Sequence, residues 1–197
     1  MSNFRRPKHL TTRRMQETRP NPPKEQAKAQ RPAREIRWNC PAAAKCGGCQ
    51  LQNLSYAEQL KFKQRKVEKL LGEFAHVEPI IGMAEPYHYR NKVQAAFATA
   101  RNGKIISGVY QSGTHSIVCV DSCLTEDRKA DEIIVSIRNM LKSFRIQPYD
   151  ERSGGGTLRH VLVKRGFKTN QIMVVLVTSG PIFPAKNNFV KALRKEH

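Results

Sequence analysis

Three cysteines within ten residues constrain this chain more than any other feature of its sequence. Cys40, Cys46 and Cys49 have the spacing C-x5-C-x2-C, and two glycines separate the last pair. Thiolates this close together on a flexible backbone suit a metal centre better than they suit packing. The chain has five cysteines, an odd number, and its basic amino terminus lacks the apolar run of a secretory signal. We therefore expect reduced thiols, a cytoplasmic location and a metal site rather than a disulfide framework.

A thiolate-held metal centre needs about four ligands, so one more must come from elsewhere in the chain. Cys119 falls in a predicted strand and is interpreted as a small core residue. Cys123 follows that strand in a loop, where its thiol can turn toward a distant centre more easily, so we prefer it as the fourth ligand.

Iron and zinc remain open as the metal, because ligand number and type do not separate them. Zinc would suit two thiolate pairs, Cys46/Cys49 and Cys119/Cys123. That pairing leaves Cys40 unused. Three adjacent thiolates, with glycines that let backbone amides face inorganic sulfide, favour a [4Fe–4S] cluster held by Cys40, Cys46, Cys49 and Cys123.

The charge of the chain predicts a polyanionic partner. There are 35 Lys and Arg against 16 Asp and Glu, a formal net charge of +19. Nucleic acid is the first candidate and an anionic membrane the second. No apolar run approaches the roughly 18 residues of a membrane span. Residues 1–37 carry 11 Lys and Arg against 3 Glu together with five prolines, which predicts a disordered basic tail. The tail either keeps the chain in solution or adds phosphate contacts.

Residues 38–197 are predicted to form one α+β domain in which helices pack on antiparallel β-hairpins. Ser55 and Glu58 form a capping box that begins a helix, and Gly72 is placed as its C-cap. Asn102-Gly103 predicts a type I′ hairpin turn. A second helix is expected from a Thr125 cap to about Phe144. The remaining expected elements are strands over 93–100, 104–110, 115–120, 158–165 and 171–178, and a helix over about 185–195.

Four stretches of this sequence resemble the RNA uracil-5-methyltransferase family, and most closely its iron–sulfur branch that modifies 23S ribosomal RNA. They run from residue 40 almost to the carboxyl end. The stretches are Cys40-x5-Cys46-Gly-Gly-Cys49-Gln-Leu-Gln, Tyr89-Arg-Asn-Lys-Val-Gln94, Ile117-Val-Cys-Val-Asp-Ser-Cys123 and Leu158-Arg-His-Val-Leu-Val-Lys-Arg-Gly166.

The resemblance implies a function in RNA modification. The family uses S-adenosylmethionine to methylate C5 of a uridine after a catalytic cysteine has added to C6 of the ring. In the iron–sulfur branch a central domain holds a [4Fe–4S] cluster and helps to bind the RNA. By motif position the ligands would be Cys40, Cys46, Cys49 and Cys123.

The chain also departs from the family pattern in ways that restrict the activity expected of it. The place of an amino-terminal OB-type domain is taken by the basic tail. We expect the S-adenosylmethionine domain to be absent, so no catalytic residue is assigned and the chain would be a truncated form, inactive alone. A separate chain would then have to supply that domain. Ser153-Gly-Gly-Gly156 precedes a strand rather than a helix, so it predicts a turn and no nucleotide loop.

Six residues on or beside the predicted strands are candidates for RNA contact. Each taken singly suits a solvated surface, but together with the net charge of +11 on residues 38–197 they favour RNA binding. The six are Arg90, Lys92, Arg159, His160, Lys164 and Arg165. Two other hypotheses remain. One is an independent zinc- or cluster-binding RNA module, and the other is a small redox protein, which the basic charge disfavours.

Overall fold

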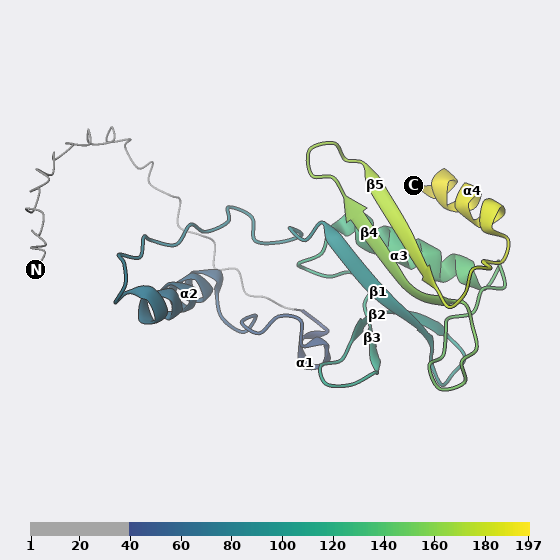
Figure 1. Ribbon diagram of the computed structural model, residues 1–197, viewed down its shortest axis with the longest axis horizontal. Coiled ribbons are helices and arrows are strands. Elements are labelled where there is room, and N and C mark those ends of the chain that lie inside the picture. Colours follow the sequence, from purple (N-terminus) through teal and green to yellow (C-terminus); the bar gives the residue numbers. More distant parts are fainter. Residues whose placement is uncertain (1–39) are drawn as a thin grey trace, which may run out of the picture. The chain divides into compact units, whose positions relative to one another are not determined.

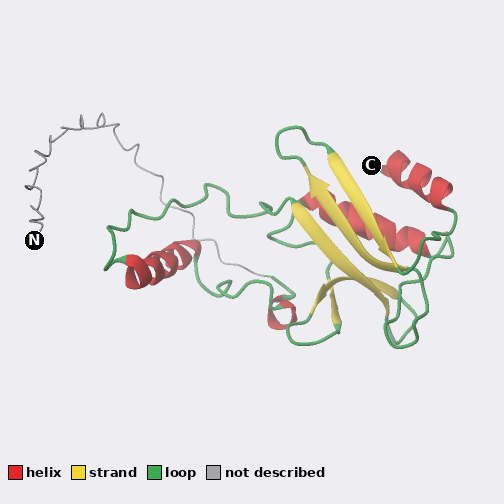
Figure 2. Ribbon diagram, viewed as in Figure 1, coloured by secondary structure: helices red, strands yellow, loops and turns green. Residues whose placement is uncertain are grey.

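A computed structural model describes residues 40–197 of the chain, all within one unit, Arg34–His197. The predicted basic tail over 1–37 lies outside the described residues. The described part has four helices and a five-stranded antiparallel sheet, which confirms the α+β prediction (Figure 1, Figure 2). The elements are α1 (Ala43–Cys46), α2 (Tyr56–Leu71), β1 (Lys92–Thr99), β2 (Ile105–Tyr110), β3 (Ile117–Cys119), α3 (Arg128–Leu141), β4 (Leu158–Arg165), β5 (Ile172–Thr178) and α4 (Lys186–Glu196).

The sheet has the order β3-β2-β1-β4-β5, and β1 pairs with β4 to join two hairpins. In the first hairpin Gly103 alone takes a positive φ, of 77°, and its N–H donates to the carbonyl of Ala100. A type I′ turn would need a positive φ at Asn102 as well. The predicted turn type was therefore wrong. The Asn102 side chain instead accepts a hydrogen bond from the N–H of Lys104, at 3.1 Å.

One face of the sheet carries the core. Alternate residues of β1 and β4 point to this face, because side chains alternate along a strand. Val93, Val161 and Val163 are buried there against α3. Phe189 brings α4 onto the same core and packs edge-to-face with Phe144 at 5.2 Å between ring centroids. Figure 1 shows α3 behind the sheet and no helix drawn in front of β1, β4 and β5.

The capping box of α2 is present as predicted. The Ser55 hydroxyl accepts a hydrogen bond from the N–H of Glu58, and the Glu58 carboxylate accepts one from the N–H of Ser55. Gly72 is the C-cap of α2, as predicted, and its N–H donates to the carbonyl of Glu68; its φ of −63° is right-handed. The apolar side chains of α2 are not buried: Leu71 is 53% exposed, and the only buried residue of α2 is Gln59.

Helix α3 begins later than predicted, because Asp127 rather than Thr125 is its N-cap. The Asp127 carboxylate accepts a hydrogen bond from the N–H of Ala130 at 3.1 Å. Ahead of the helix, Glu126 forms a β-bridge with Arg90: the N–H of Arg90 donates to the carbonyl of Thr125, and the N–H of Asp127 donates to the carbonyl of Arg90. Because of this pairing, α3 begins only at Arg128. The pairing also connects the segment just before β1 to the loop that carries Cys123.

Candidate metal centre and nucleic-acid interface

Helix α1 positions the three clustered cysteines. It is a single turn that ends at Cys46, and Gly47 follows it with a left-handed φ of 66°. A side chain at Gly47 would approach the Ser112 Cβ to 2.8 Å, so this position needs glycine both for its φ and for its space. The chain therefore reverses sharply between Cys46 and Cys49. Cys40, Cys46 and Cys49 are all half-buried with free thiols.

Cys123 lies in the loop between β3 and α3. Its backbone N–H donates to the Asp131 carboxylate at 2.8 Å, and its Sγ lies 3.3 Å from Thr125 Oγ1. Its thiol is half-buried and free. Cys119, in contrast, is exposed, so its interpretation as a core residue was wrong. Its strand is at the edge of the sheet, and Arg138 donates to its sulfur at 3.5 Å.

The other three predicted ligands act electrostatically on Cys49. Burial raises the pKa of the Cys49 thiol, and the charges of Cys123, Cys46 and Cys40 raise it further, while Arg90 lowers it. These thiols therefore share one neighbourhood. Across residues 40–197, however, no three His, Cys, Asp or Glu side chains are grouped closely enough to hold a metal ion. Thiols are the donor type that iron–sulfur clusters and structural zinc use, but the described residues do not bring these four together as a formed metal site.

A buried acidic pair supports the Cys123 loop. Glu126 and Asp131 are both buried. Burial is the main cause that raises the pKa of Glu126 to about 7, followed by the charge of Asp131 and a hydrogen bond between the two side chains. Burial also raises the pKa of Asp131. Arg90 lies 3.9 Å from the Glu126 carboxylate and His88 contacts the Glu126 carbonyl at 2.8 Å, so the pair is enclosed by groups from the start of the sheet.

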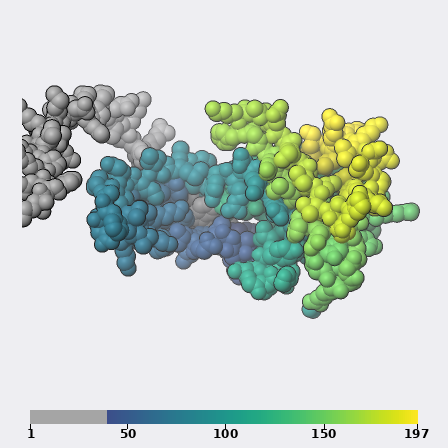
Figure 3. All heavy atoms as spheres, in the orientation of Figure 1, coloured from purple at the N-terminus to yellow at the C-terminus, as the bar shows by residue number. Residues whose placement is uncertain are grey.

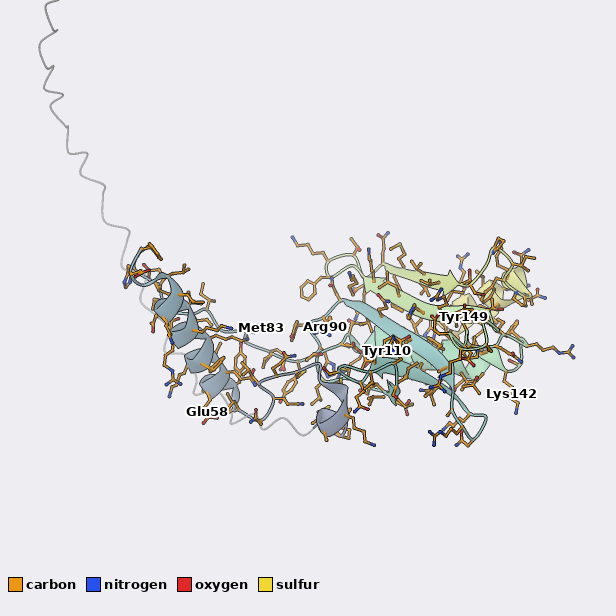
Figure 4. The ribbon with its side chains drawn as sticks, turned by 60° about the horizontal axis from the view of Figure 1, so that its bottom comes forward. Glu58, Met83, Arg90, Tyr110, Lys142 and Tyr149 are labelled. Atoms are coloured by element: carbon orange, nitrogen blue, oxygen red, sulfur yellow. The ribbon has the colours of Figure 1, made fainter. Side chains whose placement is uncertain are left out.

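A cavity of about 390 Å³ adjoins Cys49. Polar and aromatic side chains line it beside aliphatic ones, and Figure 4 labels two of its lining residues, Met83 and Arg90. The Tyr56 hydroxyl accepts a hydrogen bond from the N–H of Met83 at 2.7 Å, and Gln59 donates to the carbonyl of Leu54. Several of its polar groups thus hold the segments around the cavity in place.

The structure divides the six RNA-contact candidates into two groups. Three arginines are already paired. Arg90 pairs with Glu126, Arg165 donates to Asp127 at 2.9 Å, and Arg159 pairs with Glu151. Arg159 also lies over the Tyr149 ring, 4.7 Å from its centroid.

The other three candidates share the sheet face opposite α3. Lys92 and Lys164 are partners in the register of β1 and β4, and both are exposed. His160 lies on the same face, two alternations along β4 from Lys164. Its Nδ1 is buried without a hydrogen-bond partner in the described part of the chain.

Sequence reasoning missed Tyr110 as a functional candidate. It is 42% exposed, and its ring packs edge-on against His160 and His115, with ring centroids 6.3 Å and 6.4 Å apart. Strand alternation carried this signal. Ala96 pairs with both Gly108 and His160, so these residues lie on one face of the sheet. Tyr110 is two residues after Gly108 and therefore lies on the same face. Placing the ring on that face required the pairing of β1 with β4.

Within residues 40–197, none of the helices is both long and apolar enough to cross a membrane.

Known proteins similar to this chain are RNA methyltransferases. No protein-family model matches the chain. An uncharacterized RNA methyltransferase of Clostridium tetani is 40% identical over 168 residues, which are 83% of this chain and 36% of the relative. An uncharacterized RNA methyltransferase of Clostridium acetobutylicum is 44% identical over 165 residues, 80% of this chain and 35% of the relative. The chain thus spans little more than a third of the length of these curated relatives.

A solved structure extends the similarity to the fold. The crystal structure of the Pyrococcus abyssi tRNA (uracil-54, C5)-methyltransferase, in complex with S-adenosyl-L-homocysteine, matches with a TM-score of 0.60 and 28% identity. The match covers 74% of this chain and 34% of that one. Together with the two clostridial sequences, this structure supports the relationship of the chain to the RNA uracil-5-methyltransferase family.

Proposed function

We propose that this chain is the RNA-recognition and cluster-binding portion of an S-adenosylmethionine-dependent RNA uracil-C5 methyltransferase that modifies 23S ribosomal RNA. The observation that carries the proposal is the combined sequence and fold similarity to a uracil-C5 methyltransferase structure, at 28% identity and a TM-score of 0.60. In this proposal residues 38–197 form the central domain, and residues 1–37 form a basic tail that adds phosphate contacts.

The proposed metal ligands are Cys40, Cys46, Cys49 and Cys123. A bound [4Fe–4S] cluster would supply a cross-link between the α1 segment and the loop after β3, which are far apart in the sequence. Gly47 and the Asp131 carboxylate are placed to orient this set. Gly47 lets the chain reverse between two thiols, and Asp131 accepts the Cys123 N–H. Arg90 supplies a positive charge near Cys49, which favours its thiolate form.

Metal analysis of two single variants tests the ligand set. The wild-type chain, purified without oxygen, is expected to be brown and to contain about four iron atoms. Cys123→Ser should lose the iron and lower the melting temperature, because metal binding and folding are coupled. Cys119→Ser is the matched control, since this exposed thiol lies outside the proposed set, and it should keep both.

Three outcomes would contradict the proposed centre: a colourless protein with stoichiometric zinc, equal iron loss in both variants, or full iron retention in Cys123→Ser. Zinc would favour the hypothesis of an independent zinc-binding RNA module.

RNA binding is tested with a 23S rRNA fragment. The affinity of the chain for the fragment is expected to fall steeply between 50 mM and 200 mM salt, because each lysine or arginine that contacts a phosphate releases counterions. Absence of binding, or an affinity that does not change with salt, would refute the proposal that the chain recognises RNA through its basic surface.

A further inference from the structure

The sheet face opposite α3, which we name the open face, combines lysines with exposed aromatic and apolar side chains. It carries Lys92, Tyr110, His160, Lys164, Met173 and Val175. The strand register places them together, since Lys164 pairs with both Lys92 and Met173. Tyr110, Met173 and Val175 are all exposed. In Figure 3 the yellow-green atoms of the β4–β5 hairpin form part of the surface that faces the reader.

The charge of the open face is entirely positive. The five strands contain no Asp or Glu. Lys92 and Lys164 lie opposite each other, and neither has an ion-pair partner among the described residues. Like charges directly opposite each other destabilise a sheet. On the helix face, by contrast, Arg165 is neutralised by Asp127. The lysine pair of the open face is thus complementary to a polyanion.

Aromatic rings lie near the centre of the same face. The Tyr110 ring is roughly perpendicular to the rings of His160 and His115, and Tyr110 remains 42% exposed, so part of its side chain is available to a ligand. Figure 4 labels Tyr110 within the sheet. Burial lowers the pKa of His160, with Arg159 as the next cause, so its ring is held neutral at pH 7.

We propose that the open face binds unpaired RNA, with a base stacked on Tyr110 and phosphates held by Lys92 and Lys164. This inference rests on the proposed function, and it uses two of the six candidate residues, Lys92 and Lys164, together with Tyr110. Single-stranded RNA is the favoured occupant because its bases are free to stack on aromatic rings while lysines follow the backbone. The bases of an RNA duplex are stacked on each other and cannot meet Tyr110 in this way.

Binding of the full chain to a labelled single-stranded RNA of about 12 nucleotides, and to a duplex of the same length, tests the proposal. Tyr110→Ala is expected to weaken single-strand binding about 5- to 100-fold and to leave duplex binding nearly unchanged, since one stacked base is lost. Tyr110→Phe keeps the ring and should bind as the wild type does. If Tyr110→Ala fails to fold, Tyr110→Leu replaces it in the comparison.

The lysine pair is tested by charge removal. The double change Lys92→Gln and Lys164→Gln should reduce the slope of log affinity against log salt by about 1.4 on the single strand. The matched control is Lys191→Gln with Lys195→Gln, which removes the same charge from exposed positions of α4 on the helix side. This control should change the slope much less.

Other results would overturn the inference. RNA binding that both open-face variants leave intact would place the RNA elsewhere on the chain, while the proposed function would stand. No binding of the wild type to either this probe or the 23S fragment would refute the proposed function itself. A dimer in sedimentation that Val175→Asp dissociates would instead assign the open face to a second copy of the chain.

Discussion

At the scale of single residues, Glu126 provides the clearest link between protonation and folding. Its carboxyl is buried beside Asp131, and its pKa is raised to about 7 from the ordinary 4.5. A raised pKa means that the folded state holds the proton more tightly than the unfolded chain does. The stabilisation is complete below about pH 4.5 and is lost as the pH rises through 7. The opposing charge is Arg90, which lowers the pKa of Glu126 but does not reverse the direction of the shift.

We therefore expect the unfolding free energy to fall by about 1–2 kcal/mol between pH 5 and pH 8 because of this group, a figure reduced for residual solvent access. Glu126→Gln mimics the protonated carboxyl and should flatten that change. Urea unfolding at a series of pH values measures it. Glu132→Gln, at an exposed position on α3, is the control and should keep the wild-type slope. An unchanged slope in Glu126→Gln would show that another group titrates.

Residue types and spacing predicted the candidate ligands, but they did not predict their surroundings. The choice of Cys123 over Cys119 as a ligand required only that one cysteine follows a strand in a loop, and it stays a prediction. The exposure of Cys119 was missed because the sequence did not show that its strand is at the edge of the sheet. The acidic pair was also missed, since Glu126 and Asp131 resemble ordinary first-turn residues of a helix.

At the scale of elements, α3 is the main support of the sheet. Its buried residues include Ile133, Ile134 and Ile137, which face the sheet at helical spacing. Ile137→Ala is expected to lower the unfolding free energy by about 2–5 kcal/mol, because it leaves a cavity between helix and sheet. Val190→Ala on α4 is the control, at 43% exposure, and should cost less than about 1 kcal/mol. Denaturant titrations of both variants should differ clearly, and equal losses would contradict this account of the core.

The ends of elements were less predictable than their existence. Apolar periodicity located α3 and β4, because burial against one face imposes the pattern. The first residue of α3 depends on the pairing of Thr125 and Glu126 with Arg90, which is about 35 residues earlier in the chain. The apolar residues of α2, such as Leu71, recur at helical spacing but are exposed. The spacing predicts a helix, but it does not show which part of the protein covers that helix.

At the scale of the whole molecule, positive charge is divided between the predicted tail and the domain. Residues 1–37 carry a net +8 of the total +19, and residues 38–197 carry +11. If the tail adds only phosphate contacts, its effect on RNA binding should not depend on whether the bases are paired. The open face is expected to account for the preference for single strands, because it combines the exposed Tyr110 ring with the lysines Lys92 and Lys164.

Deletion of residues 1–37 is therefore expected to weaken single-strand and duplex binding by similar factors. The salt slope should fall by no more than about 6, the limit if all eight net charges met phosphates of a single strand. A chain that keeps the tail length but carries Gln at its Lys and Arg positions controls for chain length and should behave like the deletion. Fluorescence anisotropy at several salt concentrations gives both quantities. A deletion that removes the preference for single strands would assign base contact to the tail rather than to Tyr110.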